Sequence, residues 1–511
     1  MSRITEELLS KLRAGEEVRA NLISLRAELK KNEKERSIVL KFLRAEGNVL
    51  INLLQHEDAK ARKNAALILG ELPCEEAEEA LYEAYVKEAQ LFVRSSYLEA
   101  LLKLGSEAYV PELTEQLKVL EAEEQSEDTA KHRAEERKLL RELLSDAVGV
   151  SRHTFTGVDR PAELVLMTNR NHIATTVEQL LKLFGDKLKY KEVGVGVRLI
   201  VEKLSDVLPL RTYEEFLFVV PGMGACPCEV KAAAKVIAES ELLPFLERRH
   251  AEKGQAYRFR IEYRGKLEAE QKGKFLRQLS AELETLTKHK LVNSTSDYEL
   301  EIRMIENKEG RLNLLVKLFT LLDERFAYRS EAVAASIRPV NAALTMELVK
   351  SYLKQDAQVL DPFCGVGTML AERAKMGHIG NLYGIDSFGE AIEKARKNTE
   401  AAGLFANYIN RDFFDFKHEY LFDELITDMP FLPPNVTDRN RQAELEQLYR
   451  RFFAKAKEHL KKGAVLVLYV RNPELVQKYA GRSGYRVEKE FEINKIERSY
   501  VFVLQLEGDK G

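Results

Sequence analysis

Residues 359–370 read Val-Leu-Asp-Pro-Phe-Cys-Gly-Val-Gly-Thr-Met-Leu, and this stretch decides the fold of the last third of the chain. A short apolar run ends at Asp361, a turn with Gly365 and Gly367 follows, and a helical pattern opens at Met369. This order predicts a strand, a glycine loop and a helix. In an open α/β sheet such a loop lies at the carboxyl end of its strand, where ligands bind. The glycines would let backbone N–H groups approach a ligand, although a plain tight turn uses the same residues.

Strands and helices alternate through the rest of residues 326–511. This alternation predicts a mostly parallel, Rossmann-like α/β sheet of seven strands covered on both faces. The last two strands are joined by a short link and should form an antiparallel edge. After the strand that ends at Asp361, the expected strands are 382–386, 408–412, 424–428, 464–470, 485–493 and 499–506.

Four of these strands end in an acid, namely Asp361, Asp386, Asp412 and Asp428. Four carboxylates along one rim would repel one another unless they share a cationic or hydroxyl-rich ligand. Asp386 lies 21 positions after Gly365, the spacing at which a carboxylate meets ribose hydroxyls in dinucleotide folds. The loop lacks the full three-glycine pattern and has an acid at its entrance. A ligand with a ribose, an adenine and a positive centre therefore fits better, and S-adenosylmethionine has all three.

The segment Asp428-Met-Pro-Phe431 follows its strand directly. It would place a carboxylate and an aromatic ring beside a methyl donor, although an ordinary turn could have the same sequence. A carboxylate that accepts the N–H groups of an exocyclic amine stabilises the positive charge that develops during methyl transfer. The ring of Phe431 would stack on a nucleobase that has left its neighbours.

The whole chain has 511 residues, too many for one core, so about three domains are expected. The net charge of −3 argues against a globally basic nucleic-acid binder but permits a local basic face. No window is apolar enough for a signal or membrane segment, so a soluble, cytoplasmic protein without membrane contact is expected. The four cysteines are scattered, and Cys226-Pro-Cys228 lacks zinc-knuckle spacing, so we expect neither a disulfide framework nor a metal site.

Residues 1–150 have apolar residues at helical spacing and very little Gly or Pro. Two similar blocks place Arg62 and Arg94 at equivalent positions, 32 residues apart. A period of this size predicts an α-solenoid, and the blocks resemble HEAT repeats. Such a segment could bind a protein partner or RNA, or could be a rigid cap on the next domain. Its mixed charge does not favour phosphate binding.

Residues 151–325 predict an α+β region of two successive units. Between residues 248 and 277, ten Lys and Arg stand against four Glu. Basic residues that alternate with aromatic ones suit phosphate contact beside base stacking, although a solvated basic face would have the same composition. The candidate RNA-binding residues are Arg258, Arg260, Arg264 and Lys272, with Arg338 from the segment before the glycine loop. The expected strands are 162–167, 216–220, 257–263, 298–304 and 312–318, with helices over 174–184, 230–248 and 272–286.

The segment Asp361–Thr368, with Ser336-Ile-Arg-Pro upstream and Thr427-Asp-Met-Pro-Phe downstream, closely resembles the class I RNA methyltransferases that act on guanine N2. This is the THUMP-linked tRNA and rRNA family, and the resemblance covers about residues 325–507. The order of elements in the middle region also resembles the family's RNA-binding THUMP region. Two features depart from the family: Met429 stands where proline is usual, and a HEAT-like region is not part of the usual layout.

The resemblance implies S-adenosylmethionine as the cofactor and RNA, most simply tRNA, as the partner. It implies that Asp361, Gly365 and Gly367 contact the methionine part of the donor, Asp386 its ribose and Asp412 its adenine. The candidate cofactor-binding residues are Asp361, Phe363, Cys364, Gly365, Gly367, Thr368, Asp386, Ser387, Asp412 and Phe413. The candidate catalytic residues are Asp428, Pro430 and Phe431, and Asp428 and Phe431 would hold the target base.

The predicted function is methyl transfer to the exocyclic N2 of guanosine in structured RNA. A second enzyme hypothesis is N6-adenine methylation of DNA or RNA, because that chemistry uses a similar motif. A hypothesis of another class is a non-catalytic scaffold for RNA or protein with a silent methyltransferase fold. Under any of these hypotheses, the HEAT-like region could bind a protein partner.

Overall fold

The computed structural model describes residues 3–31, 35–36, 39–41, 43, 48–72, 74, 76–105, 108–122, 130–147, 152–334, 336–433 and 436–507. The chain divides into two compact units, Met1–Arg152 and His153–Gly511. None of the helices in the described ranges combines the length and the apolar content that a membrane span requires.

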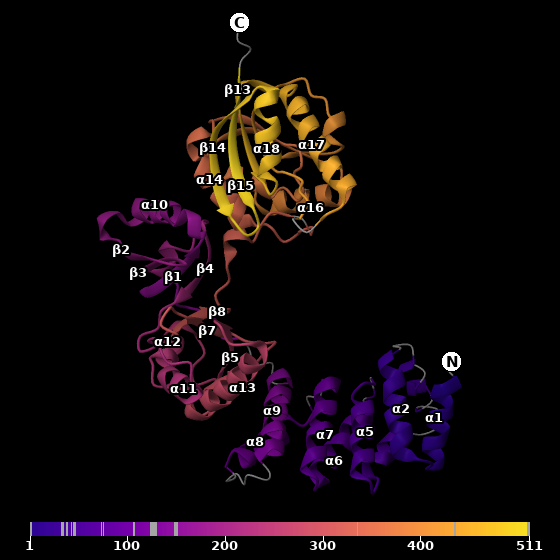
Figure 1. Cartoon of the computed structure of the whole chain (residues 1–511). Coiled ribbons are helices and arrows are strands. Elements are labelled where there is room, and N and C mark those ends of the chain that lie inside the picture. Colours follow the sequence, from indigo (N-terminus) through magenta and orange to yellow (C-terminus); the bar gives the residue numbers. More distant parts are fainter. Residues whose placement is uncertain are drawn as a thin grey trace. The chain divides into compact units, whose positions relative to one another are not determined.

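The first unit consists of helices that stack beside one another (Figure 1). Helix α5 packs on α7 especially closely, because a Cβ atom on Gly70 would lie 2.5 Å from the Cα atom of Ala100. The helices are α1 (Arg3–Ala14), α2 (Val18–Lys31), α4 (Val49–Asn52), α5 (Ala59–Leu69), α6 (Glu76–Lys87), α7 (Leu91–Leu104), α8 (Val110–Ala122) and α9 (Ala130–Ala147).

Each of the two equivalent arginines of this unit forms an ion pair with a glutamate of a later segment. Arg62 on α5 donates through Nε and Nη2 to the two carboxylate oxygens of Glu88, both at 2.8 Å. Arg94 on α7 donates to Glu136 on α9 at 2.6 Å. Both glutamates are buried, so the periodic arginine has a structural role and does not present a free cation to solvent.

In the second unit, residues 153–318 form a mixed eight-stranded sheet with the strand order β2-β3-β1-β4-β8-β7-β5-β6. The helices are α10 (Ile173–Phe184), α11 (Val230–Ala238), α12 (Leu242–Arg249) and α13 (Ala269–Leu286). The strands are β1 (Ala162–Thr168), β2 (Lys189–Val193), β3 (Gly196–Val201), β4 (Tyr213–Phe218), β5 (Tyr257–Arg264), β6 (Leu291–Asn293), β7 (Leu300–Glu306) and β8 (Leu312–Leu318).

This sheet differs from the two separate units that the sequence suggested. Strand β4 pairs with β8 through Phe218 and Val316, which joins the two halves into one sheet. The β2–β3 hairpin was not predicted, because the mostly exposed strand β2 reads Lys-Tyr-Lys-Glu-Val and lacks apolar alternation. The single helix expected over 230–248 is two helices, since a turn intervenes in which Ser240 Oγ accepts the N–H of Leu242.

Residues 339–506 form the seven-stranded sheet predicted from the sequence, with the order β11-β10-β9-β12-β13-β15-β14. It is parallel from β11 to β13, and β15 runs antiparallel to both of its neighbours. The helices, several labelled in Figure 1, are α14 (Pro339–Val349), α15 (Thr368–Ala374), α16 (Gly389–Ala401), α17 (Arg439–Lys457) and α18 (Pro473–Tyr479). The strands are β9 (Ala357–Asp361), β10 (Ile379–Asp386), β11 (Asn407–Asn410), β12 (Phe422–Asp428), β13 (Leu460–Val470), β14 (Tyr485–Asn494) and β15 (Ser499–Leu506).

A buried ion pair fastens α15 to β12. Arg373 donates to both carboxylate oxygens of Glu424, at 2.7 and 2.9 Å, and each side chain is 1% exposed. Arg373 also donates to the carbonyl oxygen of Lys354 at 2.7 Å. The helix that follows the glycine loop is thereby fixed to the strand that ends at Asp428.

We expect Arg373→Met to lower the local stability of this sheet by about 3–5 kcal/mol, because the substitution leaves Glu424 as an uncompensated buried charge. The opening free energy of the β12 amides, measured by native-state hydrogen exchange on the full chain, would report the loss. Arg486→Met is the matched control. Its ion pair with Glu488 is on the surface and should contribute less than about 1 kcal/mol. Equal effects of the two substitutions would contradict the prediction.

Candidate active site

A cleft of about 470 Å³ opens at the rim of the seven-stranded sheet. It brings together every candidate cofactor-binding and catalytic residue except Gly367. The candidates that line it are Asp361, Phe363, Cys364, Gly365, Thr368, Asp386, Ser387, Asp412, Phe413, Asp428, Pro430 and Phe431. The other lining residues were not among the candidate site residues. Six of them belong to motifs quoted from the sequence, namely Ser336, Ile337, Pro362, Val366, Met369 and Met429, and the rest are Val333, Phe388, Ala391, Phe414 and Leu448.

The acids converge because four parallel strands are adjacent in the order β11, β10, β9 and β12. Asp361, Asp386 and Asp428 are the last residues of their strands. Asp412 lies two residues beyond the end of β11, where its carboxylate caps a short turn. Since parallel strands have their carboxyl ends at the same edge, all four carboxylates reach one side of the cleft.

The glycine loop has the backbone that its sequence predicts. Gly365 and Gly367 have φ angles of +50° and +80°, in the left-handed region that favours glycine. The N–H of Gly365 donates to Oδ2 of Asp386 at 2.9 Å. A Cβ atom on Gly367 would lie 2.3 Å from Oη of Tyr408, and that hydroxyl forms a 2.7 Å hydrogen bond with Thr399.

Asp361 at the base of the loop is 1% exposed. Its Oδ1 atom accepts the N–H of Phe363 at 3.2 Å, whereas Oδ2 is buried without a hydrogen-bond partner among the described residues. Burial raises the pKa of Asp361 to about 8. The Thr427 hydroxyl and the N–H of Phe363 oppose this shift, and the charges of Asp386 and Asp428 add to it. A buried carboxylate of this kind suits a ligand that carries positive charge.

Main-chain N–H groups hold the next two acids. Oδ1 of Asp386 accepts the N–H of Phe388, and Oδ1 of Asp412 accepts the N–H of Phe414, both at 2.9 Å. Each carboxylate keeps free acceptor positions, because it has about four. Phe388 is 52% exposed although it lines the cleft, so its ring is available to a ligand. Its position directly after Asp386-Ser387 was the one signal in the sequence that could have identified it.

Asp428 is paired with Arg471, which sequence analysis missed. Oδ1 of Asp428 lies 3.0 Å from Nη1 of Arg471, and the guanidinium carbon lies 4.1 Å from the centre of the Phe431 ring. Burial raises the pKa of Asp428 to about 6, and the charge of Arg471 opposes this shift. The backbone of the motif is also fixed, since the N–H of Met429 donates to the carbonyl of Tyr469 at 2.9 Å.

None of the candidate RNA-binding residues is among those that line this cleft, and two of them pair with buried glutamates. Arg258 is buried and pairs with Asp297 and Glu299. Arg260 donates to the buried Glu301 at 2.9 Å. These contacts favour structural roles and argue against RNA contact by Arg258 and Arg260.

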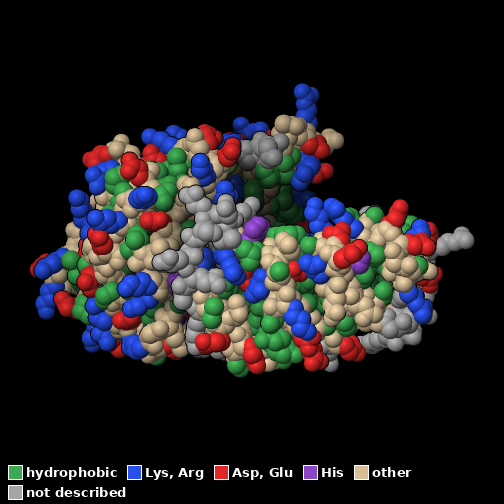
Figure 2. Space-filling model, turned by 90° about the horizontal axis from the view of Figure 1, so that it is seen from below, with side chains coloured by type: hydrophobic (Ala, Val, Ile, Leu, Met, Phe, Trp, Pro, Cys, Tyr) green, Lys and Arg blue, Asp and Glu red, His purple; other side chains and the backbone are tan. Residues whose placement is uncertain are grey.

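The other three candidates are more accessible. Arg264 and Arg338 are exposed, with ion-pair distances of 3.9 Å to Glu262 and 3.4 Å to Glu214, and Lys272 is half-buried on α13. On the face shown in Figure 2, Lys and Arg side chains are interspersed with Asp and Glu. RNA binding by Arg264, Lys272 and Arg338 therefore stays a prediction.

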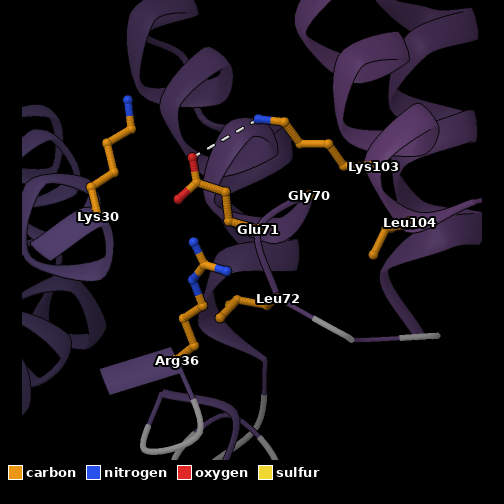
Figure 3. A pocket seen from close by; sticks show the side chains of 7 residues that line it. All are labelled: Lys30, Arg36, Gly70, Glu71, Leu72, Lys103 and Leu104. Atoms are coloured by element: carbon orange, nitrogen blue, oxygen red, sulfur yellow. Dashed lines mark ion pairs between the residues drawn. The ribbon is translucent and has the colours of Figure 1, made fainter. Parts of the chain in front are cut away.

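A second cavity, of about 550 Å³, lies among the helical repeats of the first unit and is lined by charged and aliphatic side chains (Figure 3). Glu71, the one acid among the described residues that line it, lies 3.9 Å from Lys103. The cleft at the rim of the seven-stranded sheet contains the acids, the glycine loop and the aromatic rings, so we assign the candidate active site to that cleft. Within the described ranges, no cluster of three or more His, Cys, Asp or Glu side chains could hold a metal ion.

We expect Gly367→Ala to reduce affinity for S-adenosylmethionine at least about tenfold. Alanine at this positive φ costs about 1–2 kcal/mol, and its Cβ would push against the anchored Tyr408 hydroxyl and so displace the loop. Calorimetric titration of the full chain measures the change. Gly403→Ala is the matched control, because Gly403 has φ +67° but nothing within 4 Å of a Cβ. Unchanged affinity in Gly367→Ala would contradict this role of the loop.

Two models of known protein families match parts of this chain, and one of them covers the residues that line the cleft. Residues 327–498 match the model of the RMKL-like methyltransferase domain, and residues 47–126 match a model of HEAT repeats. A tRNA (guanine(10)-N2)-dimethyltransferase of Methanothermobacter thermautotrophicus is 29% identical over 119 residues, which are 23% of this chain and 34% of that protein. The carboxy-S-adenosyl-L-methionine synthase of Nautilia profundicola is 30% identical over 76 residues, which are 15% of this chain and 32% of that protein. The chain thus spans about a third of the length of these curated relatives.

Solved structures share the fold. TrmN from Thermus thermophilus has a TM-score of 0.51 at 18% identity, and the match covers 67% of this chain and 99% of that chain. SMU.472, solved as a complex with SAH, has a TM-score of 0.50 at 16% identity, with 69% and 99% covered. These matches extend beyond residues 327–498 and concern the fold alone. Residues 327–498 therefore match a methyltransferase domain, in a chain that also matches HEAT repeats.

Proposed function

We propose that the protein is an RNA methyltransferase that methylates the exocyclic N2 of guanosine in structured RNA, with tRNA as its substrate. The observation that carries this proposal is that Asp428, Pro430 and Phe431 line the same cleft as Asp361, Gly365 and Asp386. A carboxylate and an aromatic ring thus share one cavity with the candidate donor-binding residues.

The residues of the cleft fit S-adenosylmethionine. The unpartnered Oδ2 of Asp361 suits the donor's positive charge, and the free acceptor positions of Asp386 suit ribose hydroxyls. The exposed ring of Phe388 suits contact with the adenine. When bound, the donor supplies a methyl group on a positively charged sulfur.

In the proposed reaction, the amine nitrogen bonds to the methyl carbon while the carbon–sulfur bond breaks and its electron pair stays on sulfur. The amine then loses a proton to solvent, and S-adenosylhomocysteine is the leaving group. Asp428 would accept an N–H of this amine, which orients the nitrogen lone pair and stabilises the positive charge that develops. Phe431 would hold the base by stacking.

The acceptor-only character of an ionised carboxylate favours guanine. Guanine presents N1–H and N2–H donors side by side, so one carboxylate can accept from both. Adenine presents its N6–H donor beside the N1 lone pair, which would repel Asp428. The similarity to a tRNA guanine-N2 dimethyltransferase supports the same choice. The basic middle segment supports RNA less strongly than its composition suggested, because Arg258 and Arg260 have internal partners.

Incubation of the full chain with isotope-labelled S-adenosylmethionine and tRNA should yield N2-methylguanosine, detected by mass spectrometry of the nucleosides. Asp428→Asn should slow the reaction by about 10²–10³-fold, because it removes the charge that stabilises the transition state and keeps the shape. Labelled N6-methyladenosine without N2-methylguanosine would favour the adenine alternative. No product and no donor binding by calorimetry would favour the scaffold.

We also expect donor binding to release a proton from Asp361 near pH 7. The pKa of about 8 means that Asp361 is mostly protonated at pH 7 in the free protein, and a cationic ligand favours its ionised form. Donor affinity should therefore rise with pH up to about 8. Calorimetry in buffers of different ionisation enthalpy counts the protons released, and Asp361→Asn is the control that should abolish the contribution of this residue. Equal proton release by the native chain and Asp361→Asn would contradict the prediction.

A further inference from the structure

One guanidinium group, that of Arg471, contacts both residues of the candidate base-binding pair, Asp428 and Phe431. Arg471 follows β13 directly, and its guanidinium contacts both residues. Nη1 lies 3.0 Å from Oδ1 of Asp428, and Nη2 lies 3.5 Å from Oδ2. The same guanidinium lies over the Phe431 ring at 4.1 Å and over Tyr469 at 5.2 Å.

Arg471 approaches this pair from outside the cleft. Asp428 and Phe431 line the cleft, whereas Arg471 does not. A carboxylate has about four acceptor positions and an aromatic ring has two faces. The guanidinium uses one position on each oxygen and one face of the ring, so acceptor positions and the other face remain for a base.

We propose that Arg471 is a positioning residue of the base site, which keeps Asp428 ionised and aimed at the cleft and holds the Phe431 ring for stacking. This inference rests on the proposed methyl transfer to an exocyclic amine. It goes beyond the sequence motif, which contains no cation, and assigns part of the catalytic competence of Asp428 to a residue 43 positions later in the chain.

The other titratable groups around Asp428 do not replace Arg471. Tyr449 on α17 and Tyr469 on β13 have pKa values raised by burial and stay neutral near pH 7, so they bring no positive charge. Asp361 on β9 adds repulsion once it is ionised. Glu474 on α18 is paired with Arg498. Arg471 is thus the cation that directly compensates the Asp428 carboxylate among the residues that the structure describes.

Arg471→Met should move the acidic midpoint of the pH–kcat profile upward by about one unit, at saturating donor and RNA. The ionised form of Asp428 is the active one, and removal of Arg471 raises the pKa of Asp428 above its present value of about 6. At pH values well below the native midpoint, kcat should fall about tenfold, and the loss should disappear as the pH rises, while the donor Kd is unchanged. Arg471→Lys keeps the charge without the paired donors and should give a smaller shift.

Arg451→Met is the matched control. Arg451 also lies over an aromatic ring, that of Phe414 at 3.9 Å, but it has no contact with Asp428 among those observed. This substitution should leave the pH midpoint unchanged. The proposal would be overturned if Arg471→Met had the same pH midpoint as the native chain, or if it lost the same fraction of kcat at every pH.

A measurement without turnover separates this inference from the proposed function. The ¹³C carboxyl signal of Asp428, assigned by its loss in Asp428→Asn, can be titrated in the native chain and in Arg471→Lys. A higher pKa in Arg471→Lys supports the positioning role even if no guanosine is methylated, and an unchanged pKa overturns it. Donor binding shows whether Arg471→Met has folded, and Arg471→Lys decides the question if it has not.

Discussion

The parallel pairing of four adjacent strands places four carboxylates at one rim of a sheet, and the rest of the catalytic domain depends on how they are stabilised. Asp386 and Asp412 accept main-chain N–H groups, and Asp428 is paired with Arg471. Asp361 keeps one buried oxygen without a partner among the described residues, and its pKa is raised to about 8. Unequal stabilisation thus gives four acids of the same kind different chemical properties.

The glycine loop depends on the same tertiary framework. Its two glycines adopt the left-handed backbone conformation that the turn needs. Tyr408 on β11 occupies the space that a Cβ atom on Gly367 would need. The helix after the loop is held to β12 by the buried pair of Arg373 and Glu424. Residues that do not line the cleft therefore determine the distance between the glycine loop and the Asp428 motif.

Four arginines show that composition alone does not reveal whether a charged side chain has a partner inside the protein. The periodic Arg62 and Arg94 were correctly recognised as equivalent, and their partners are buried glutamates, Glu88 just after α6 and Glu136 on α9. Arg258 and Arg260 suggested an RNA-binding face because they alternate with aromatic residues. Their carboxylate partners lie about 40 positions later on the neighbouring β7 strand and the segment before it, so only the folded sheet reveals that these charges are compensated.

The sequence by itself determined the strands of the seven-stranded sheet, the glycine loop, the four acids and the Asp428–Phe431 motif, because each depends on local periodicity or on short spacing. It also predicted the helical repeats and the seven-stranded sheet. The tertiary structure decided that the middle region is one sheet, that Phe388 faces the cleft and that Arg471 supports Asp428. The physical reason is that these features are contacts between strands distant in the chain, and their energies depend on burial that no local pattern records.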